Sequence, residues 1–198
     1  MKFKYLFFLL IPLFVASCHS GKGTQYPKVT FGIYETIQND SIPTALIDSL
    51  KSRQFQFEGN PELTILGYIT RSDSSILDNV RPPDKIKLVT LVNPVDNNGK
   101  YLAVVAIRPL PIITISDLKK ASVQGSDVKL TFNMQGTLKL AELTKNNIGK
   151  KIAIVINNQI YSMPMVNAEL KDGLALIVLQ EQTGEAEKIS GSLNSSLP

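Results

Sequence analysis

The chain has 198 residues and a formal net charge of +4, and it contains one cysteine and one histidine. A single thiol cannot form an internal disulfide, and a zinc site built from histidine and cysteine would lack ligands. The histidine, His19, lies in a short polar stretch, so Ser-His-Asp and Cys-His catalysis, which need a positioned base, are excluded. The basic residues are scattered and not interleaved with aromatic residues, so nucleic acid is not an expected partner.

The N-terminus has the layout of a secretory signal. Lys2 and Lys4 precede an uncharged apolar run, YLFFLLIPLFVA, which is too short to span a bilayer and is interrupted by Pro12. The V-A-S-C sequence that ends at Cys18 resembles the processing box of bacterial lipoproteins. We therefore predict a signal peptide over residues 1–17 and a lipid on Cys18. The alternative is cleavage at another small residue, with the cysteine incidental.

The predicted mature chain begins with a small, polar segment. Residues 18–27 are predicted to form a flexible tether. After this tether, no segment is long and apolar enough to cross a membrane. Acyl chains on the cysteine would hold the protein on a bacterial membrane. We expect it to belong to the cell envelope and to face the periplasm.

The first part of the mature chain combines strands with one helix. A helix is predicted to open at Pro43, with Leu46, Ile47 and Leu50 at helical spacing. Residues 71–84 are polar and proline-containing and are predicted to form a loop. Alternating β-forming residues predict strands at residues 29–37, 63–69, 86–92 and 101–107, with a turn at Asn98-Gly99 before the last of them.

The second part opens with a predicted helix that begins at Ser116. This residue is a suitable N-cap, Asp117 stands in the first turn, and Leu118 and Ala121 are three residues apart. The alternation over residues 128–132 then predicts a half-buried strand.

The next predicted helix is capped by Asn133 and stopped by Gly149. Its residues Leu138, Ala141 and Ile148 share one face, which we expect to be apolar and distinct from the face of Lys139, Glu142 and Asn146.

A hairpin is predicted within KKIAIVINNQIYSMPMV, residues 150–166. The run at 152–156 has no polar alternation, which indicates a strand covered on both faces. Asn157 and Asn158 form the predicted turn, because asparagine enters left-handed conformations more easily than most residues. Pro164 lacks a backbone donor, so the return strand should be short or lie at an edge.

The chain ends with a strand at residues 174–179 and a helix that we expect Thr183 to cap. Glu185 and Glu187 lie in its first turn, and its buried stripe should consist of Ala186, Ile189 and Leu193. The whole pattern predicts an α+β fold, a mixed or antiparallel sheet with helices packed on one face. Residues 28–110 would form an N-terminal α+β region of unknown role, and residues 111–198 a second unit.

From Ile112 onward the sequence resembles the SecD family. The segments that carry the resemblance are IITISDLKKASV, VKLTFNMQGTLKLAELTKNNIGKKIAIVINNQIYSMPMV, DGLALIV and GEAEKISGSLNSSLP. They are similar, in order and spacing, to the head region of the first periplasmic domain in SecD and fused SecDF translocation factors. The resemblance implies an α+β head subdomain in the periplasm that works beside the Sec translocon and helps to pull exported chains out.

The chain departs from this family in three respects. The usual Asp-Gly turn is Asn157-Asn158 here, a change that preserves the turn geometry. The membrane helices, whose charged residues are thought to couple proton flow to motion, are absent from this sequence. The glycine-rich aspartate motif near the start of the family's periplasmic region is also missing. We therefore expect a recognition module and not a proton-driven translocase.

Nothing in the sequence indicates catalysis, a metal or a cofactor. No D-x-D-x-D-G calcium loop occurs, and the glycines of G-K-G lack the context of a phosphate-binding loop. Paired carboxylates for glycoside hydrolysis meet only in the folded chain and stay open at this point.

The candidate partner-binding residues are Tyr161, Met163, Pro164 and Met165. Methionine adapts to varied partners, and an exposed strand edge could accept an extended chain. The alternative is that the methionines fill gaps in the core and that the tyrosine ring covers the hairpin. We expect a non-enzymatic lipoprotein that binds Sec translocon components or unfolded exported chains. The alternative function is a structural or assembly component of another envelope complex that reuses the fold.

Overall fold

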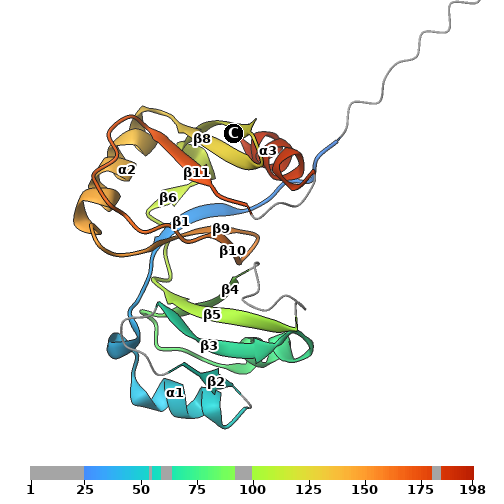
Figure 1. The fold of residues 1–198 in the computed structure, drawn as a ribbon, viewed down its shortest axis with the longest axis vertical. Helices are drawn as coiled ribbons and strands as arrows, with labels where there is room; N and C mark the ends of the chain where they lie inside the picture. The colour runs from blue at the N-terminus through green and yellow to red at the C-terminus, as the bar shows by residue number, and fades with distance from the viewer. Residues whose placement is uncertain (1–24, 54, 59–63, 92–99, 180–183) are drawn as a thin grey trace, which may run out of the picture.

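The computed structural model describes residues 25–53, 55–58, 64–91, 100–179 and 184–198. Within these residues the chain forms an eight-stranded sheet, a three-stranded sheet and three α-helices (Figure 1). The α+β class predicted from the sequence is confirmed. In the same residues no helix combines the length and the apolar character that a bilayer crossing requires. Cys18 and the predicted signal peptide lie outside the described residues.

The larger sheet mixes strands from both parts of the sequence, in the order β2-β3-β5-β4-β10-β9-β1-β6. Its pairs are antiparallel, except that β10 and β4 run parallel. In chain order its strands are β1 (Phe31–Glu35), β2 (Gln56–Phe57), β3 (Ile65–Thr70), β4 (Lys87–Leu91), β5 (Tyr101–Ile107), β6 (Ile113–Thr114), β9 (Ile152–Ile156) and β10 (Gln159–Ser162).

The smaller sheet has the order β11-β8-β7 and is antiparallel. It consists of β7 (Leu118–Gln124), β8 (Asp127–Phe132) and β11 (Leu174–Ile177). The helices are α1 (Thr44–Lys51), α2 (Met134–Asn146) and α3 (Glu185–Ser196), and three 3₁₀ segments are η1 (Asn39–Ser41), η2 (Arg71–Asn79) and η3 (Ile115–Asp117).

The strand β1 connects the two parts of the chain. It lies between β9 and β6, although it is the first strand in the sequence. Every residue of β9 is buried, which confirms the prediction of a strand covered on both faces. The division of the chain at residue 111 stays a prediction, and in space the first part supplies a strand to the interior of the second.

Five strands of the larger sheet close into a ring. Beyond β1, Thr36 forms a bridge with Ile107 at the end of β5, and the N–H of Arg108 donates to the carbonyl of Glu35. This contact joins β5 to β1 and completes the circuit β1-β9-β10-β4-β5. Inside it lies a core to which all five strands contribute: Tyr34, Val89, Val105, Ile107, Ala153, Val155 and Ile160.

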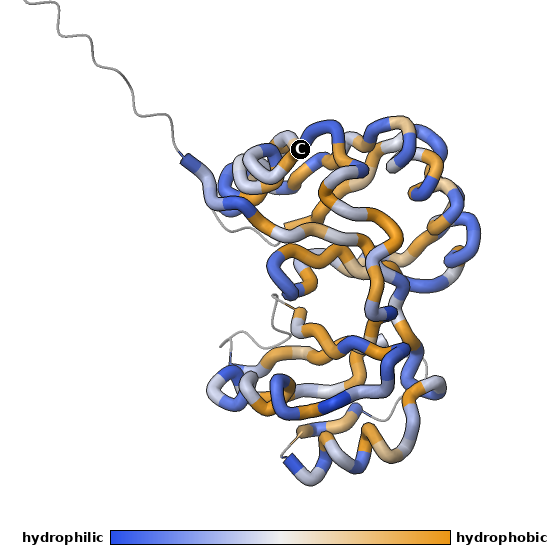
Figure 2. Tube along the Cα trace, turned by 180° about the vertical axis from the view of Figure 1, so that it is seen from behind, coloured by the Kyte–Doolittle hydropathy of each residue, from blue (hydrophilic) through white to orange (hydrophobic). Residues whose placement is uncertain are grey.

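Two further cores lie on the opposite face of the larger sheet. One joins α1 to β3 and β5, and the other joins β1 and β9 to the three-stranded sheet, α2 and α3. The helices therefore pack on one face, as predicted. Figure 2 shows apolar residues along the strands of both parts and hydrophilic residues in the outer turns.

The predicted helix at Ser116 is wrong. The chain makes only the single 3₁₀ turn η3 there and continues as strand β7. Leu118 and Ala121 are both buried because a bulge in β7 shifts its register with β8 between Leu118 and Lys120. The extra residue gives a strand a spacing of three between inward positions, which imitates helical periodicity.

The predicted α2 helix is confirmed, but its apolar face at Leu138 is not the buried one. Leu138 is 62% exposed and Ile148, just beyond the helix, is 55% exposed. The buried residues of the helix are instead Gly136, Leu140, Leu143 and Thr144. Leu140 and Leu143 belong to the core of the second part. Asn133 caps the helix, because its side-chain oxygen accepts from the N–H of Gly136 at 2.9 Å.

The remaining differences concern boundaries. Helix α1 opens after Pro43 as expected, and part of the predicted loop at residues 71–84 forms η2. Gly184, with φ at 80°, is the N-cap of α3, whereas Thr183 and the predicted Asn98-Gly99 turn lie outside the described residues. The return strand β10 is short and ends before Pro164, but it is interior because it pairs with both β9 and β4.

Candidate functional site

The β9–β10 hairpin turns at Asn157 and Asn158, as predicted. Both residues have positive φ, 47° and 63°, which asparagine tolerates better than most residues. Asn157 is also tied to the N-terminal segment, since its side-chain oxygen accepts from the N–H of Thr30 at 3.0 Å and its own N–H donates to the Thr30 carbonyl at 3.1 Å. The turn is therefore held in place from outside the hairpin.

The four predicted partner-binding residues do not form one surface. Tyr161 packs against the core beneath α2 and α3, and Met163 packs into the ring core on the opposite face. The carbonyl of Pro164 accepts from the N–H of Ile152 at 3.1 Å, a structural contact. Met165 alone among the four is exposed, at 54%. Their partner-binding role stays a prediction, and Met165 is the best placed of them to carry it.

Tyr161 is partly buried against the core of the second part. Burial raises the pKa of the Tyr161 hydroxyl, and the Glu185 carboxylate at the start of α3 raises it further. The Tyr161 side chain packs against the core that includes Ala186, Ile189 and Leu193 of α3. This agrees with the alternative reading in which it covers the hairpin.

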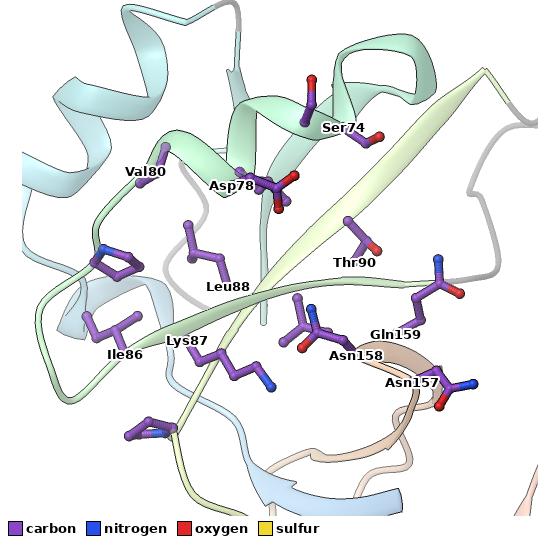
Figure 3. Close-up of a pocket in the computed structure, with 15 residues that line it drawn as sticks. Ser74, Asp78, Val80, Ile86, Lys87, Leu88, Thr90, Asn157, Asn158 and Gln159 are labelled. Carbon is purple, nitrogen blue, oxygen red and sulfur yellow. The ribbon is translucent and has the colours of Figure 1, made fainter. Parts of the chain in front are cut away.

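A groove of about 660 Å³ opens beside the same turn (Figure 3). Its lining comes from four places in the sequence: η2 and the segment after it, β4 with the residue before it, Pro109 just after β5, and the hairpin residues 157–159. Volumes of this size are typical of ligand-binding clefts. The turn that the sequence singled out is thus one wall of a cleft whose other walls come from the first part of the chain.

Strand β4 runs through this groove with one edge half open. Its pairing with β10 joins only Thr90 to Gln159 and Leu91 to Ile160. The first three residues of β4, from Lys87 to Val89, pair with β5 along the opposite edge of the strand. Among the described residues no strand continues β10 alongside the first half of β4, because the chain turns away there at Asn157 and Asn158. An open strand edge of this kind can pair with an extended chain.

The described lining of the groove contains one lysine and one aspartate, on opposite sides of β4. The Lys87 side chain extends below the strand in Figure 3, and Asp78 comes from η2 above it. The Lys87 ammonium lies 5.4 Å from the centre of the Tyr34 ring, a favourable cation–π distance. Burial lowers the pKa of the Lys87 amine. This ammonium is only partly hydrated, so it would gain from an anionic partner.

The described lining of the groove can form hydrogen bonds and one charged contact of each sign. Its polar side chains are amides, hydroxyls, the lysine and the aspartate. Hydrolysis of a glycoside requires two carboxyl groups, and Asp78 is the single one in the described lining. Over the described residues, no group of three or more His, Cys, Asp and Glu side chains is placed to hold a metal ion.

Sequence reasoning missed most of this site. Lys87 and Thr90 belong to an ordinary alternating strand, and η2 was predicted as a loop. Their meeting with the hairpin depends on the parallel pairing of β4 with β10, which joins residues about seventy positions apart. The Asn157-Asn158 turn was the only local signal.

The fold and the groove together define an α+β protein with a cleft beside a half-open strand edge. The family model described as "SecDF, P1 head subdomain" matches residues 91–198 of this chain. The match covers more than half of the sequence, so the chain belongs to the SecDF P1 head subdomain family.

Two of the similar proteins are translocase subunits by name. The chain is 35% identical over 94 residues to the protein translocase subunit SecDF of Thermus thermophilus, covering 44% of this chain and 13% of that protein. It is 33% identical over 121 residues to the protein translocase subunit SecD of Rhodothermus marinus, covering 57% of this chain and 20% of that protein. The chain thus spans no more than a fifth of the length of either relative.

A similar solved structure is that of SecDF, described as a membrane component that enhances protein export. It matches 87% of this chain and 64% of that chain at 23% identity, with a TM-score of 0.49.

Proposed function

We propose that this protein is a non-enzymatic accessory to protein export, anchored by a lipid on Cys18 and facing the periplasm. Its partners would be extended segments of exported chains or components of the Sec translocon. The observation that carries the proposal is the membership of residues 91–198 in the SecDF P1 head subdomain family. The relatives of this family named above are translocase subunits.

The groove supports a role in holding an extended chain. A segment in transit is unfolded, so its backbone N–H and C=O groups are free to pair with a strand edge. The first half of β4 offers such an edge, and the amides and hydroxyls of the groove can bond to further backbone groups. Backbone pairing does not depend strongly on side chains, which suits a protein that meets many exported sequences.

Photocrosslinking in living cells tests the proposal. A photoreactive amino acid would replace Gln159, which is exposed in the groove, and a second would replace the exposed Met165. The control position is Ser126, which is exposed in the turn between β7 and β8. Fractionation of the same cells would show whether the protein is held on the membrane.

We expect adducts with secreted chains in transit or with Sec components from Gln159 and not from Ser126. Adducts confined to unrelated envelope proteins would favour the alternative, a structural component of another envelope complex. If the protein is folded and held on the membrane but gives no adduct from Gln159 or from Met165, the proposed partners are contradicted.

A further inference from the structure

We infer that the groove selects extended segments that place one acidic side chain beside Lys87 and apolar or hydroxyl side chains at the two flanking positions. This inference rests on the proposed function and adds to it a substrate class and a register. It follows from the half-open edge of β4, from the placement of two charges on opposite sides of that strand, and from the partners that each charge has.

The first step is the alternation of side chains along a strand. A segment that pairs with the first half of β4 extends the sheet, and its successive side chains point to opposite faces. One face is that of Lys87 and Val89, the side of the ring core. The other is that of Leu88 and Thr90, which η2 overhangs. Each bound residue therefore meets one of two chemically different surfaces.

The second step is the charge on the Lys87 face. Among the described residues, no carboxylate forms a salt bridge with the Lys87 ammonium, and its neighbour is the Tyr34 ring. A partly buried ammonium without a counter-ion loses hydration without compensation. A carboxylate from a bound segment would supply the missing charge in a site where solvent screening is reduced.

The third step is the charge on the opposite face. Asp78 stands there among Leu88, Thr90 and the serines of η2. A second acidic side chain, at a position adjacent to the first, would point toward Asp78 and be repelled by it. Apolar and hydroxyl side chains fit this face instead. The two charges together favour a single acidic residue in one register over a run of acidic residues.

An anionic lipid headgroup could also approach Lys87, but it has no backbone to pair with β4. The open edge therefore favours a polypeptide, and binding to a membrane surface becomes an outcome that the experiment can detect.

The test is a binding titration with the purified full chain, followed by fluorescence anisotropy. The probes are short dye-labelled peptides of alternating threonine and valine with a central glutamate, and matched peptides with glutamine or with two adjacent glutamates at the centre. Variant Lys87→Met keeps the length of the side chain and removes its charge. The matched control is Lys85→Met, an exposed lysine outside the groove.

We expect the glutamate peptide to bind about tenfold more tightly than the glutamine peptide, as a charge-assisted contact can provide. The adjacent-glutamate peptide should lose part of this advantage. Lys87→Met should abolish the preference and leave the glutamine peptide unaffected, and Lys85→Met should preserve it. The preference should shrink when NaCl rises from about 50 to about 500 mM.

Equal affinity for all peptides would overturn the charge selection and leave the proposed function intact. Binding of anionic phosphatidylglycerol vesicles, lost in Lys87→Met and without peptide binding, would overturn the inference in favour of a membrane contact. The proposed function is judged separately by the crosslinks from Gln159, so the failure of one can be told from the failure of the other.

Discussion

At the scale of single residues, Asp117 is a buried carboxylate held by several hydrogen bonds. Its side chain is 5% exposed and forms a salt bridge with Lys139 at 2.8 Å. It also accepts from the N–H of Thr114 at 2.8 Å and closes the capping box of η3. Burial by itself would raise the pKa of Asp117, but the hydrogen bonds from Lys139 and Thr114 and the Lys139 charge hold the pKa below its usual value of 3.8.

The variant Asp117→Asn should destabilise the fold by about 1–3 kcal/mol at pH 7, because Lys139 and Thr114 lose a charged acceptor. A carboxyl group whose pKa is lower in the folded than in the unfolded protein stabilises the fold when the pH is above its unfolded-state pKa. This stabilisation is lost as the pH falls through the folded-state pKa. The difference from the wild type should therefore be full at pH 7 and shrink below about pH 4. Urea unfolding at a series of pH values measures it.

The exposed Asp48 on α1 provides the control, and Asp48→Asn should change the stability much less. If Asp117→Asn lost as much stability at pH 3 as at pH 7, the charge would not be the cause.

Asn158 allows a second prediction, which concerns the backbone of the hairpin turn. Its φ of 63° is disfavoured for β-branched residues and free of cost for glycine. Asn158→Gly should leave the stability unchanged or raise it slightly, whereas Asn158→Val should lower it by about 1–2 kcal/mol. Thermal unfolding of the two variants and the wild type measures these changes in stability. Equal losses in both would mean that the asparagine side chain, and not the backbone conformation, stabilises the turn.

At the scale of elements, the contact between α2 and η3 is close because of a glycine. A Cβ at Gly136 would meet the backbone carbonyl oxygen of Asp117, which cannot move as a flexible side chain could. Gly136→Ala should therefore destabilise the protein by about 1–3 kcal/mol, although alanine is the better helix former. Gln135→Ala, at the exposed neighbouring position, should be nearly neutral. Chemical unfolding of both variants tests this, and a stabilised Gly136→Ala would show that η3 can shift.

The elements also show which sequence signals are enough to predict a helix or strand and its buried face. Uniform burial of β9 follows from its unbroken apolar run, and Asn133 identified the start of α2 correctly. The same rules failed at β7, where a bulge gave strand residues a helical spacing. They also failed on α2, where Leu138 is apolar but exposed. Periodicity reports which residues share a face, but not whether another element covers that face.

The candidate site was less predictable than the elements. Its turn, Asn157-Asn158, could be found from two adjacent residues, because the left-handed backbone is a local property. Lys87 and Asp78 could not, because their positions depend on the pairing of β4 with β10 and on the course of η2. The local backbone conformation is determined by neighbouring residues, whereas the position of a cleft depends on which distant strands pair.

At the scale of the whole molecule, β1 makes the two parts interdependent. Phe31 and Ile33 contribute to the core of the second part, and Tyr34 contributes to the ring core. The backbone of β1 pairs along its whole length with β9 and partly with β6. A fragment that starts at the family match or at residue 111 would lack this strand and leave one side of β9 unpaired.

We therefore predict that residues 91–198 alone will not form a stable fold. Loss of Phe31 and Ile33 exposes apolar surface of β9 and α3, and each large buried side chain removed from a core costs about 2–5 kcal/mol. Such a loss approaches the total stability of a typical domain. The fragment should give poorly dispersed amide NMR spectra and no cooperative thermal transition. Joining residues 25–37 to its C-terminus, close to where Val29 bonds to Ser196, should restore both. A dispersed spectrum from the fragment without that strand would show that the family core folds independently of β1.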